Sequence, residues 1–153
     1  MSSLVGMNRV NTISRKHMVQ RNSSTSDATD MKALMDLFGR KHTYLRISLT
    51  EKCNFRCVYC MPEDGVELTS RDKLPTLDER KRLISLFVKL GVSKLRFTGG
   101  EPTLSNQLLP LLKHASSLKS PINNDVLAIE SMGITTNGFN LKNNLQSYKD
   151  AGK

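Results

Sequence analysis

The sequence has no tryptophan, only three cysteines and no long apolar run. Its longest apolar groupings, such as Leu83-Ile84, fall far short of the roughly 18 uninterrupted apolar residues that a membrane span needs. A membrane-spanning protein is therefore excluded. The cysteines are odd in number and lie within eight residues, which argues against a small disulfide-stabilised protein. The chain of 153 residues is 38% hydrophobic and 24% charged, as expected of a globular protein.

Acidic residues are absent from residues 1–26, a segment that is also rich in serine and threonine. Its basic residues are Arg9, Arg15, Lys16 and Arg21. This composition is typical of a mitochondrial transit peptide, so we predict a leader over residues 1–26 and a location in the mitochondrial matrix. A plain basic tail without folded structure is the alternative. This segment supplies +4 of the net charge of +9, and a leader's charge is no sign of a nucleic acid partner. We expect neither nucleic acid nor a membrane as a partner.

Strand and helix patterns alternate through the rest of the chain. Residues 44–50 alternate strictly, with Leu45, Ile47 and Leu49 on one face and Arg46 among the polar residues on the other. Thr76-Leu77-Asp78-Glu79 predicts a helix start by its capping-box pattern. Strands are predicted over 44–50, 94–98 and 127–136, and helices over 27–38, 76–91, 106–118 and 141–151.

This alternation predicts an α/β fold with parallel strands. Three strands leave the edges of the sheet open, and the pattern calls for a fourth strand after Lys153. We therefore interpret residues 27–153 as a truncated domain and the chain as a piece of a longer protein.

The three cysteines form a C-x3-C-x2-C motif directly after the first predicted strand: Cys53, Cys57 and Cys60. Spacers this short bring successive thiolates to one side of a turn, where they can hold one metal centre. Iron–sulfur clusters take such ligands, and three cysteines leave one iron of a [4Fe-4S] cluster open. Zinc is an alternative, although His42 and His114 are not at zinc-finger spacing. Thiols that hold no metal are the other alternative.

A second motif, Gly99-Gly100-Glu101-Pro102, follows the second predicted strand. Together with the cysteine motif and Tyr59, which precedes the last cysteine, it resembles the radical S-adenosylmethionine (SAM) superfamily. The resemblance implies one [4Fe-4S] cluster on the three cysteines. It also implies SAM contacts from Tyr59, Gly99, Gly100 and Glu101, although Glu101 could equally be a loop carboxylate without a ligand.

A narrower resemblance covers about residues 32–152. The matching segments are Leu45-Arg46-Ile47-Ser48-Leu49-Thr50, Cys53 through Gly65, Leu95 through Pro102 and Thr135-Thr136-Asn137-Gly138. They resemble the GTP 3′,8-cyclase family of molybdenum cofactor biosynthesis. The resemblance implies that SAM is cleaved reductively and that the deoxyadenosyl radical takes a hydrogen from the ribose of GTP. The sugar carbon then bonds to guanine C8, which gives (8S)-3′,8-cyclo-7,8-dihydroguanosine 5′-triphosphate.

The same resemblance assigns GTP contacts to Arg46, Arg96 and Thr135. The strand pattern agrees, because it places both arginines on polar strand faces, where a triphosphate would suit their fork geometry. The alternative is that each arginine pairs with a local carboxylate such as Glu130. No catalytic residue is assigned beyond the cluster ligands.

The family fold is a partial (β/α)6 barrel related to the TIM barrel, of which this chain would supply about three βα units, the N-terminal half. The family's second, C-terminal cluster has no cysteines in this chain. We therefore expect the chain to be inactive alone. The implied partners are GTP, SAM, an electron donor and a downstream pterin-forming enzyme, and the full-length parent would be a candidate homodimer.

Overall fold

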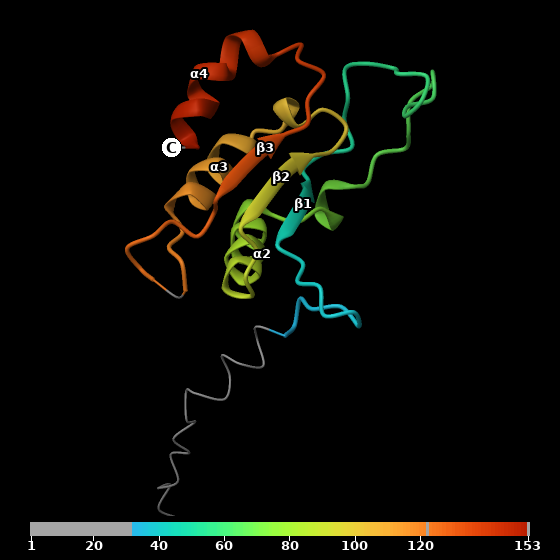
Figure 1. Ribbon diagram of the computed structural model, residues 1–153. Coiled ribbons are helices and arrows are strands. Elements are labelled where there is room, and N and C mark those ends of the chain that lie inside the picture. The colour runs from blue at the N-terminus through green and yellow to red at the C-terminus, as the bar shows by residue number, and fades with distance from the viewer. Residues whose placement is uncertain (1–31, 122, 153) are drawn as a thin grey trace, which may run out of the picture.

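A computed structural model describes residues 32–121 and 123–152 (Figure 1). The predicted leader, residues 1–26, therefore lies outside the described residues. Each of three strands is followed by a helix. In chain order the elements are β1 (Tyr44–Ser48), the short 3-10 helix η1 (Arg71–Lys73), α2 (Leu77–Lys89), β2 (Lys94–Thr98), the 3-10 helix η2 (Pro102–Leu104), α3 (Leu108–Ser117), β3 (Ser131–Ile134) and α4 (Leu141–Ala151).

The three strands form one parallel sheet in the order β1-β2-β3, which confirms the α/β prediction. Arg46 of β1 lies in register with Arg96 of β2, and Arg96 with Gly133 of β3. Helices α2 and α3 lie against one face of this sheet (Figure 1). The carboxyl ends of all three strands meet at one edge, where the loops that carry the motifs begin.

The core lies between the sheet and these two helices. Leu95 and Phe97 of β2 are 1% and 0% exposed, and they pack with Ile84 of α2 and with Leu108 and Leu111 of α3. Burial of one such side chain contributes about 1.5–3 kcal/mol. The alternation of the strands therefore decides which face meets the helices, and it leaves the polar strand residues on the opposite face.

Helix α2 begins and ends where its local sequence predicts. Thr76 accepts a hydrogen bond from the Glu79 amide while the Glu79 carboxylate accepts one from the Thr76 amide, so the predicted capping box is present. Gly91 follows the helix with φ +104°, a conformation that favours glycine. Ile84 and Val88 of α2 are buried in the core, whereas Leu83 is 47% exposed.

Two of the predicted elements differ from the structure. The helix expected over 27–38 is wrong in its described part, where Met35 instead pairs with Lys41 in an isolated antiparallel bridge. The Asp36 carboxylate accepts hydrogen bonds from the backbone of Phe38 and Arg40, and so offers those amides an alternative to a helix.

The third strand, expected over 127–136, covers only Ser131–Ile134. Leu127 pairs antiparallel with Lys119 at the end of α3, and the Ala128 amide donates to the Leu118 carbonyl. The start of the predicted strand thus belongs to a turn that follows α3. Within the described residues, no helix is both long and apolar enough to cross a membrane.

Candidate functional site

The glycine motif lies directly against the backbone that leads into the cysteine motif. The Gly100 amide donates to the Thr50 carbonyl at 2.6 Å, and the Glu101 amide donates to the Lys52 carbonyl at 2.8 Å. A Cβ atom on Gly99 would lie 2.4 Å from the Thr50 carbonyl oxygen, and one on Gly100 would lie 2.4 Å from that of Lys52. Both positions therefore require glycine for the contact between the two loops, whatever ligand they meet.

The three thiols are neighbours on the loop after β1. The amides of Cys60 and Met61 donate to the Cys57 carbonyl at 3.0 and 2.9 Å, which forms a tight turn. Desolvation raises the pKa of the Cys60 thiol, and so do the charge and hydrogen bond of Cys57 and the charge of Cys53. All three cysteines are free.

The three thiols are close together in the sequence, but their side chains are not arranged as the ligands of one metal ion. Across residues 32–121 and 123–152, no three His, Cys, Asp or Glu side chains are arranged so that they could hold a metal ion. The donor set itself consists of soft sulfur atoms on a short loop, which suits an iron–sulfur cluster. The residues therefore fit such a cluster by their chemistry and sequence spacing.

The cysteine loop is exposed and is attached to the rest of the molecule at few points. Tyr59 is 90% exposed, so its role in SAM binding stays a prediction. Asn137, in the loop after β3, donates to the Asn54 side chain at 2.8 Å. Phe55 meets Phe139 edge to face, with ring centroids 6.0 Å apart. The loops after β1 and β3, far apart in the sequence, thus lie together.

The predicted GTP contacts come together on the polar face of the sheet. Arg46 and Arg96 occupy the same register position on adjacent parallel strands, and both are exposed. Arg96 donates through Nε to the Tyr44 hydroxyl at 2.5 Å and through Nη1 to Thr135 Oγ1 at 3.4 Å. Tyr44 belongs to no motif in the sequence, although it lies two residues before Arg46 and so on the same face of β1.

The alternative that these arginines pair with a local carboxylate is not supported. Within the described part of the chain, the ion pairs are Arg40 with Asp36 and Lys81 with Asp78, and neither includes Arg46, Arg96 or Glu130. Two guanidinium groups side by side repel one another unless an anion lies between them or nearby. This face of the sheet is therefore suited to a polyanionic ligand.

Glu101 is held by protein contacts on all sides and is 0% exposed. Its carboxylate accepts from the Thr103 amide and hydroxyl at 3.0 and 2.5 Å, from the Thr136 hydroxyl at 2.7 Å and from the Asn137 amide at 2.7 Å. Burial alone would raise the pKa of this carboxyl, but these hydrogen bonds outweigh burial and hold the pKa below its usual value.

The four hydrogen bonds give Glu101 a positioning role. An ionised carboxylate fastens the loop after β2 to the loop after β3, at the edge where the cysteine loop also begins. Its backbone is engaged as well, because the Glu101 carbonyl accepts from the Leu104 amide at 3.1 Å. Contact between Glu101 and SAM stays a prediction.

Known proteins resemble this chain over most of its length. Residues 47–153 match the family model described as the radical SAM superfamily. Over 119 residues the chain is 50% identical to molybdenum cofactor biosynthesis protein 1 of Dictyostelium discoideum and 49% identical to the mitochondrial GTP 3′,8-cyclase of Arabidopsis thaliana. It is also 40% identical, over 122 residues, to the GTP 3′,8-cyclase of Listeria monocytogenes.

These matches cover most of this chain but a minor part of each relative. They include 78%, 78% and 80% of the chain and 18%, 28% and 34% of the three relatives, in the same order. The chain therefore spans between about a fifth and a third of the length of these relatives.

Proposed function

We propose, for a chain that belongs to the radical SAM superfamily, that it forms the cluster-binding and part of the GTP-binding half of a GTP 3′,8-cyclase. The observation that carries this proposal is the in-register pair Arg46 and Arg96, backed by Tyr44 and Thr135, on the strands from which the cysteine loop and the glycine loop leave. The reaction would convert GTP to (8S)-3′,8-cyclo-7,8-dihydroguanosine 5′-triphosphate for molybdenum cofactor biosynthesis.

Cys53, Cys57 and Cys60 would hold a [4Fe-4S] cluster. Such a cluster supplies the electron that cleaves SAM reductively. The chain itself holds the two loops of the site next to one another. The backbone contact of Gly99 and Gly100 with residues 50–52 keeps the loop that would meet SAM beside the loop that carries the thiolates.

The arginines would bind the triphosphate of GTP. A guanidinium group offers paired donors that match phosphate oxygens, and Arg96 keeps its fork oriented through Tyr44 and Thr135. Because β1 and β2 are adjacent in the sheet, the backbone positions of the two arginines keep a fixed separation. The polar face can therefore orient a substrate before any chemistry begins.

The proposed function also implies an electron donor, a downstream enzyme and a location in the cell. An electron donor would reduce the site, and a downstream enzyme would convert the cyclised nucleotide to a pterin. The Arabidopsis relative is named as a mitochondrial enzyme, which supports a mitochondrial location for this protein. The composition of residues 1–26 supports the matrix more specifically.

The test is binding of labelled GTP to the anaerobically reconstituted protein, with ATP, CTP and UTP as competitors. We expect Arg46→Ala and Arg96→Ala each to weaken GTP binding about ten- to a hundredfold, the loss of one charge-assisted contact. Lysine at either position should restore part of the affinity, because it keeps the charge and loses the fork.

Arg82, which is exposed on α2 away from this face, provides the matched control, and Arg82→Ala should leave GTP binding unchanged. Equal binding of all four nucleotides, or unchanged affinity when both sheet arginines are replaced, would overturn the assignment of GTP.

A further inference from the structure

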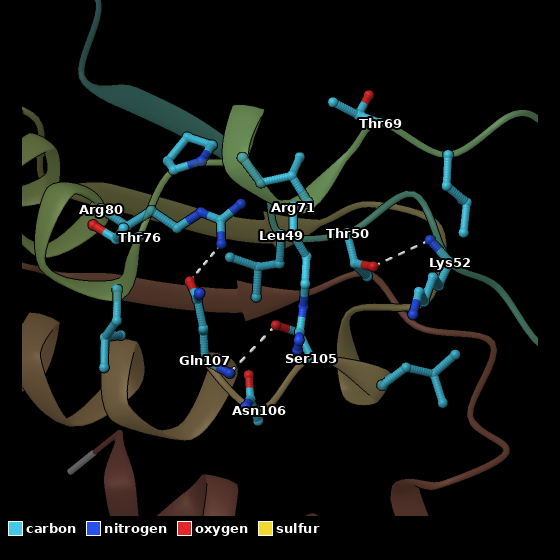
Figure 2. A pocket seen from close by; sticks show the side chains of 15 residues that line it. Leu49, Thr50, Lys52, Thr69, Arg71, Thr76, Arg80, Ser105, Asn106 and Gln107 are labelled. Carbon is cyan, nitrogen blue, oxygen red and sulfur yellow. Dashed lines mark hydrogen bonds between the residues drawn. The ribbon is translucent and has the colours of Figure 1, made fainter.

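A pocket of about 740 Å³ opens on the helix side of the sheet, away from the polar face that carries Arg46 and Arg96 (Figure 2). One wall is the end of β1 and the loop that follows it, from Leu49 to Lys52. The other walls are the segment that carries η1, the start of α2 and the turn before α3. The volume lies within the range of small-molecule sites.

The charge of the pocket lining has one sign. Of the 15 residues that line it, Lys52, Arg71 and Arg80 are cationic and none is acidic. Figure 2 shows the side chains of Arg71 and Arg80 directed into the pocket and Lys52 at the other end from Arg80. The remaining polar side chains of the lining carry hydroxyl or amide groups: Thr50, Thr69, Thr76, Ser105, Asn106 and Gln107.

Of the three cationic side chains that line the pocket, Arg80 is the buried one. The residue is only 7% exposed, and the partner that its guanidinium contacts is the neutral Gln107 side-chain oxygen. Burial lowers the pKa of Arg80, as expected for a charge without a nearby carboxylate. A buried charge is costly unless it is paired, so this guanidinium lacks the counter-ion that its burial calls for.

Two helices also point their N-termini at the pocket. Leu77 begins α2 and Gln107 precedes α3, and both residues line it. The first turn of α3 contains no acidic residue, and its N-cap makes no side-chain hydrogen bond. Helix α2 carries Asp78 and Glu79 in its first turn and a capping box, so it is the partial positive charge at the start of α3 that adds to the charge of the three cationic side chains.

Two carboxylates that are next in sequence to lining residues are already engaged elsewhere. Glu51 accepts from the amide and hydroxyl of Thr69, both at 2.7 Å. Glu79 accepts from the amide and hydroxyl of Thr76 at 2.7 and 2.8 Å. Both carboxylates therefore serve backbone turns, and neither forms an ion pair with Arg71 or Arg80 in the described residues.

From these observations we propose a second anion site in this pocket, which binds a phosphate-bearing small molecule through Lys52, Arg71 and Arg80. It goes beyond the proposed reaction, because neither Arg46 nor Arg96, the arginines assigned to GTP, lines this pocket. A phosphate group suits it better than a single carboxylate, since two guanidinium forks and the N-terminus of α3 converge on one space.

The experiment is isothermal titration calorimetry of the 153-residue chain with inorganic pyrophosphate at low salt. We expect saturable binding that weakens about tenfold or more in Arg71→Ala and in Arg80→Gln. Arg80→Lys, which keeps the charge, should retain part of the affinity. If Arg80→Gln does not fold, Arg71→Ala and Lys52→Ala decide the question, because both side chains are exposed.

Two controls locate the site. Arg82→Gln removes a charge from the exposed side of α2 and should leave pyrophosphate binding unchanged. The double variant Arg46→Ala/Arg96→Ala should retain binding to the pocket. Absence of saturable binding, equal losses in Arg82→Gln, or complete loss in the double variant would each overturn the proposal. Tricarballylate, titrated in parallel, separates the ligand classes: binding as tight as pyrophosphate, lost in the same variants, would overturn the assignment to phosphate.

Discussion

The loop after β2 and the loop after β1 carry the two motifs of the site, and the protein holds them very differently. The loop after β2 contains Glu101, 0% exposed and bound by four hydrogen bonds, and glycines pressed against the neighbouring backbone. The loop after β1 exposes Val58 and Tyr59 almost completely and is tied to the rest of the molecule by contacts such as Asn54 with Asn137.

This difference indicates which of the two loops contributes to the free energy of folding at the carboxyl edge of the sheet. The glycine and Glu101 motif belongs to the packed structure and is formed by the protein alone. The cysteine loop contributes little to packing, so its final arrangement depends on what the thiolates bind. Substitutions in the two motifs should therefore separate into effects on folding and effects on ligand content.

The largest effect on stability should come from Gly100→Ala. The added Cβ would lie 2.4 Å from the Lys52 carbonyl and 2.6 Å from that of Glu51, and backbone cannot move aside as a flexible side chain can. We expect a loss of about 3 kcal/mol or more in the free energy of unfolding, measured by urea denaturation followed by circular dichroism.

Gly138→Ala is the matched control for this variant. Gly138 has φ +80° and nothing within 4 Å of an added Cβ, so its substitution carries only the conformational penalty of about 1–2 kcal/mol. Equal losses in the two variants would show that the contact between the loops is not what requires glycine at position 100.

Glu101→Gln should have the next largest effect. The amide cannot accept all four hydrogen bonds, because its NH2 group would face a donor, and we expect a loss of about 1.5–3 kcal/mol at pH 7. The pKa of Glu101 is lowered in the folded state, so its contribution is complete above the ordinary pKa of 4.5. It is lost as the pH falls through the folded-state pKa.

The measurement is the urea midpoint of both proteins between pH 7 and pH 3. The difference between the wild-type protein and Glu101→Gln should shrink as the pH falls. A difference that stays constant with pH would mean that the charge of Glu101 does not contribute.

A smaller effect is expected for Asn54→Ala, which removes the hydrogen bond from Asn137 at 2.8 Å. An exposed hydrogen bond contributes about 0.5–1 kcal/mol. Hydrogen exchange of the cysteine-loop amides should become faster in this variant, while exchange in β2 stays unchanged. Faster exchange throughout the sheet would show that the cysteine loop is part of the cooperative core after all.

The smallest effect on stability should come from Cys57→Ser, within about 0.5 kcal/mol, because the cysteine loop adds little to the core. Iron content after anaerobic reconstitution should nevertheless fall to background, since a serine oxygen is a poor replacement for a soft thiolate. Cys60→Ser should behave alike. Full iron content in either variant would contradict the assignment of these residues as cluster ligands.

Local signals in the sequence were enough to predict several elements of the fold. The capping box at Thr76 and the glycine at position 91 define α2 without help from distant residues. The alternation of β1 and β2 correctly placed Arg46 and Arg96 on one polar face. The helix expected over 27–38 failed in its described part because one side chain, Asp36, bonds the backbone locally.

The features that the sequence did not reveal depend on partners far along the chain. Glu101 is buried because Thr136 and Asn137, 35 and 36 residues later, donate to it. Arg80 lies in the run Glu79-Arg80-Lys81-Arg82, which is typical of an exposed helix surface, yet it is buried against Gln107. Nothing within a short window of sequence could have indicated either burial.

The contact between residues 50–52 and Gly99-Gly100 also sets an order of events during synthesis. The cysteines leave the ribosome about 40 residues before the glycine loop that braces the start of their own loop. Until β2 and that loop have emerged, the thiols are carried on a segment whose base has no support, open to oxidation or to the wrong metal. Under the proposed function, the cluster would therefore be loaded late in synthesis. It would bind after Gly99-Gly100 has made its contact with residues 50–52, and not as soon as the three cysteines have emerged.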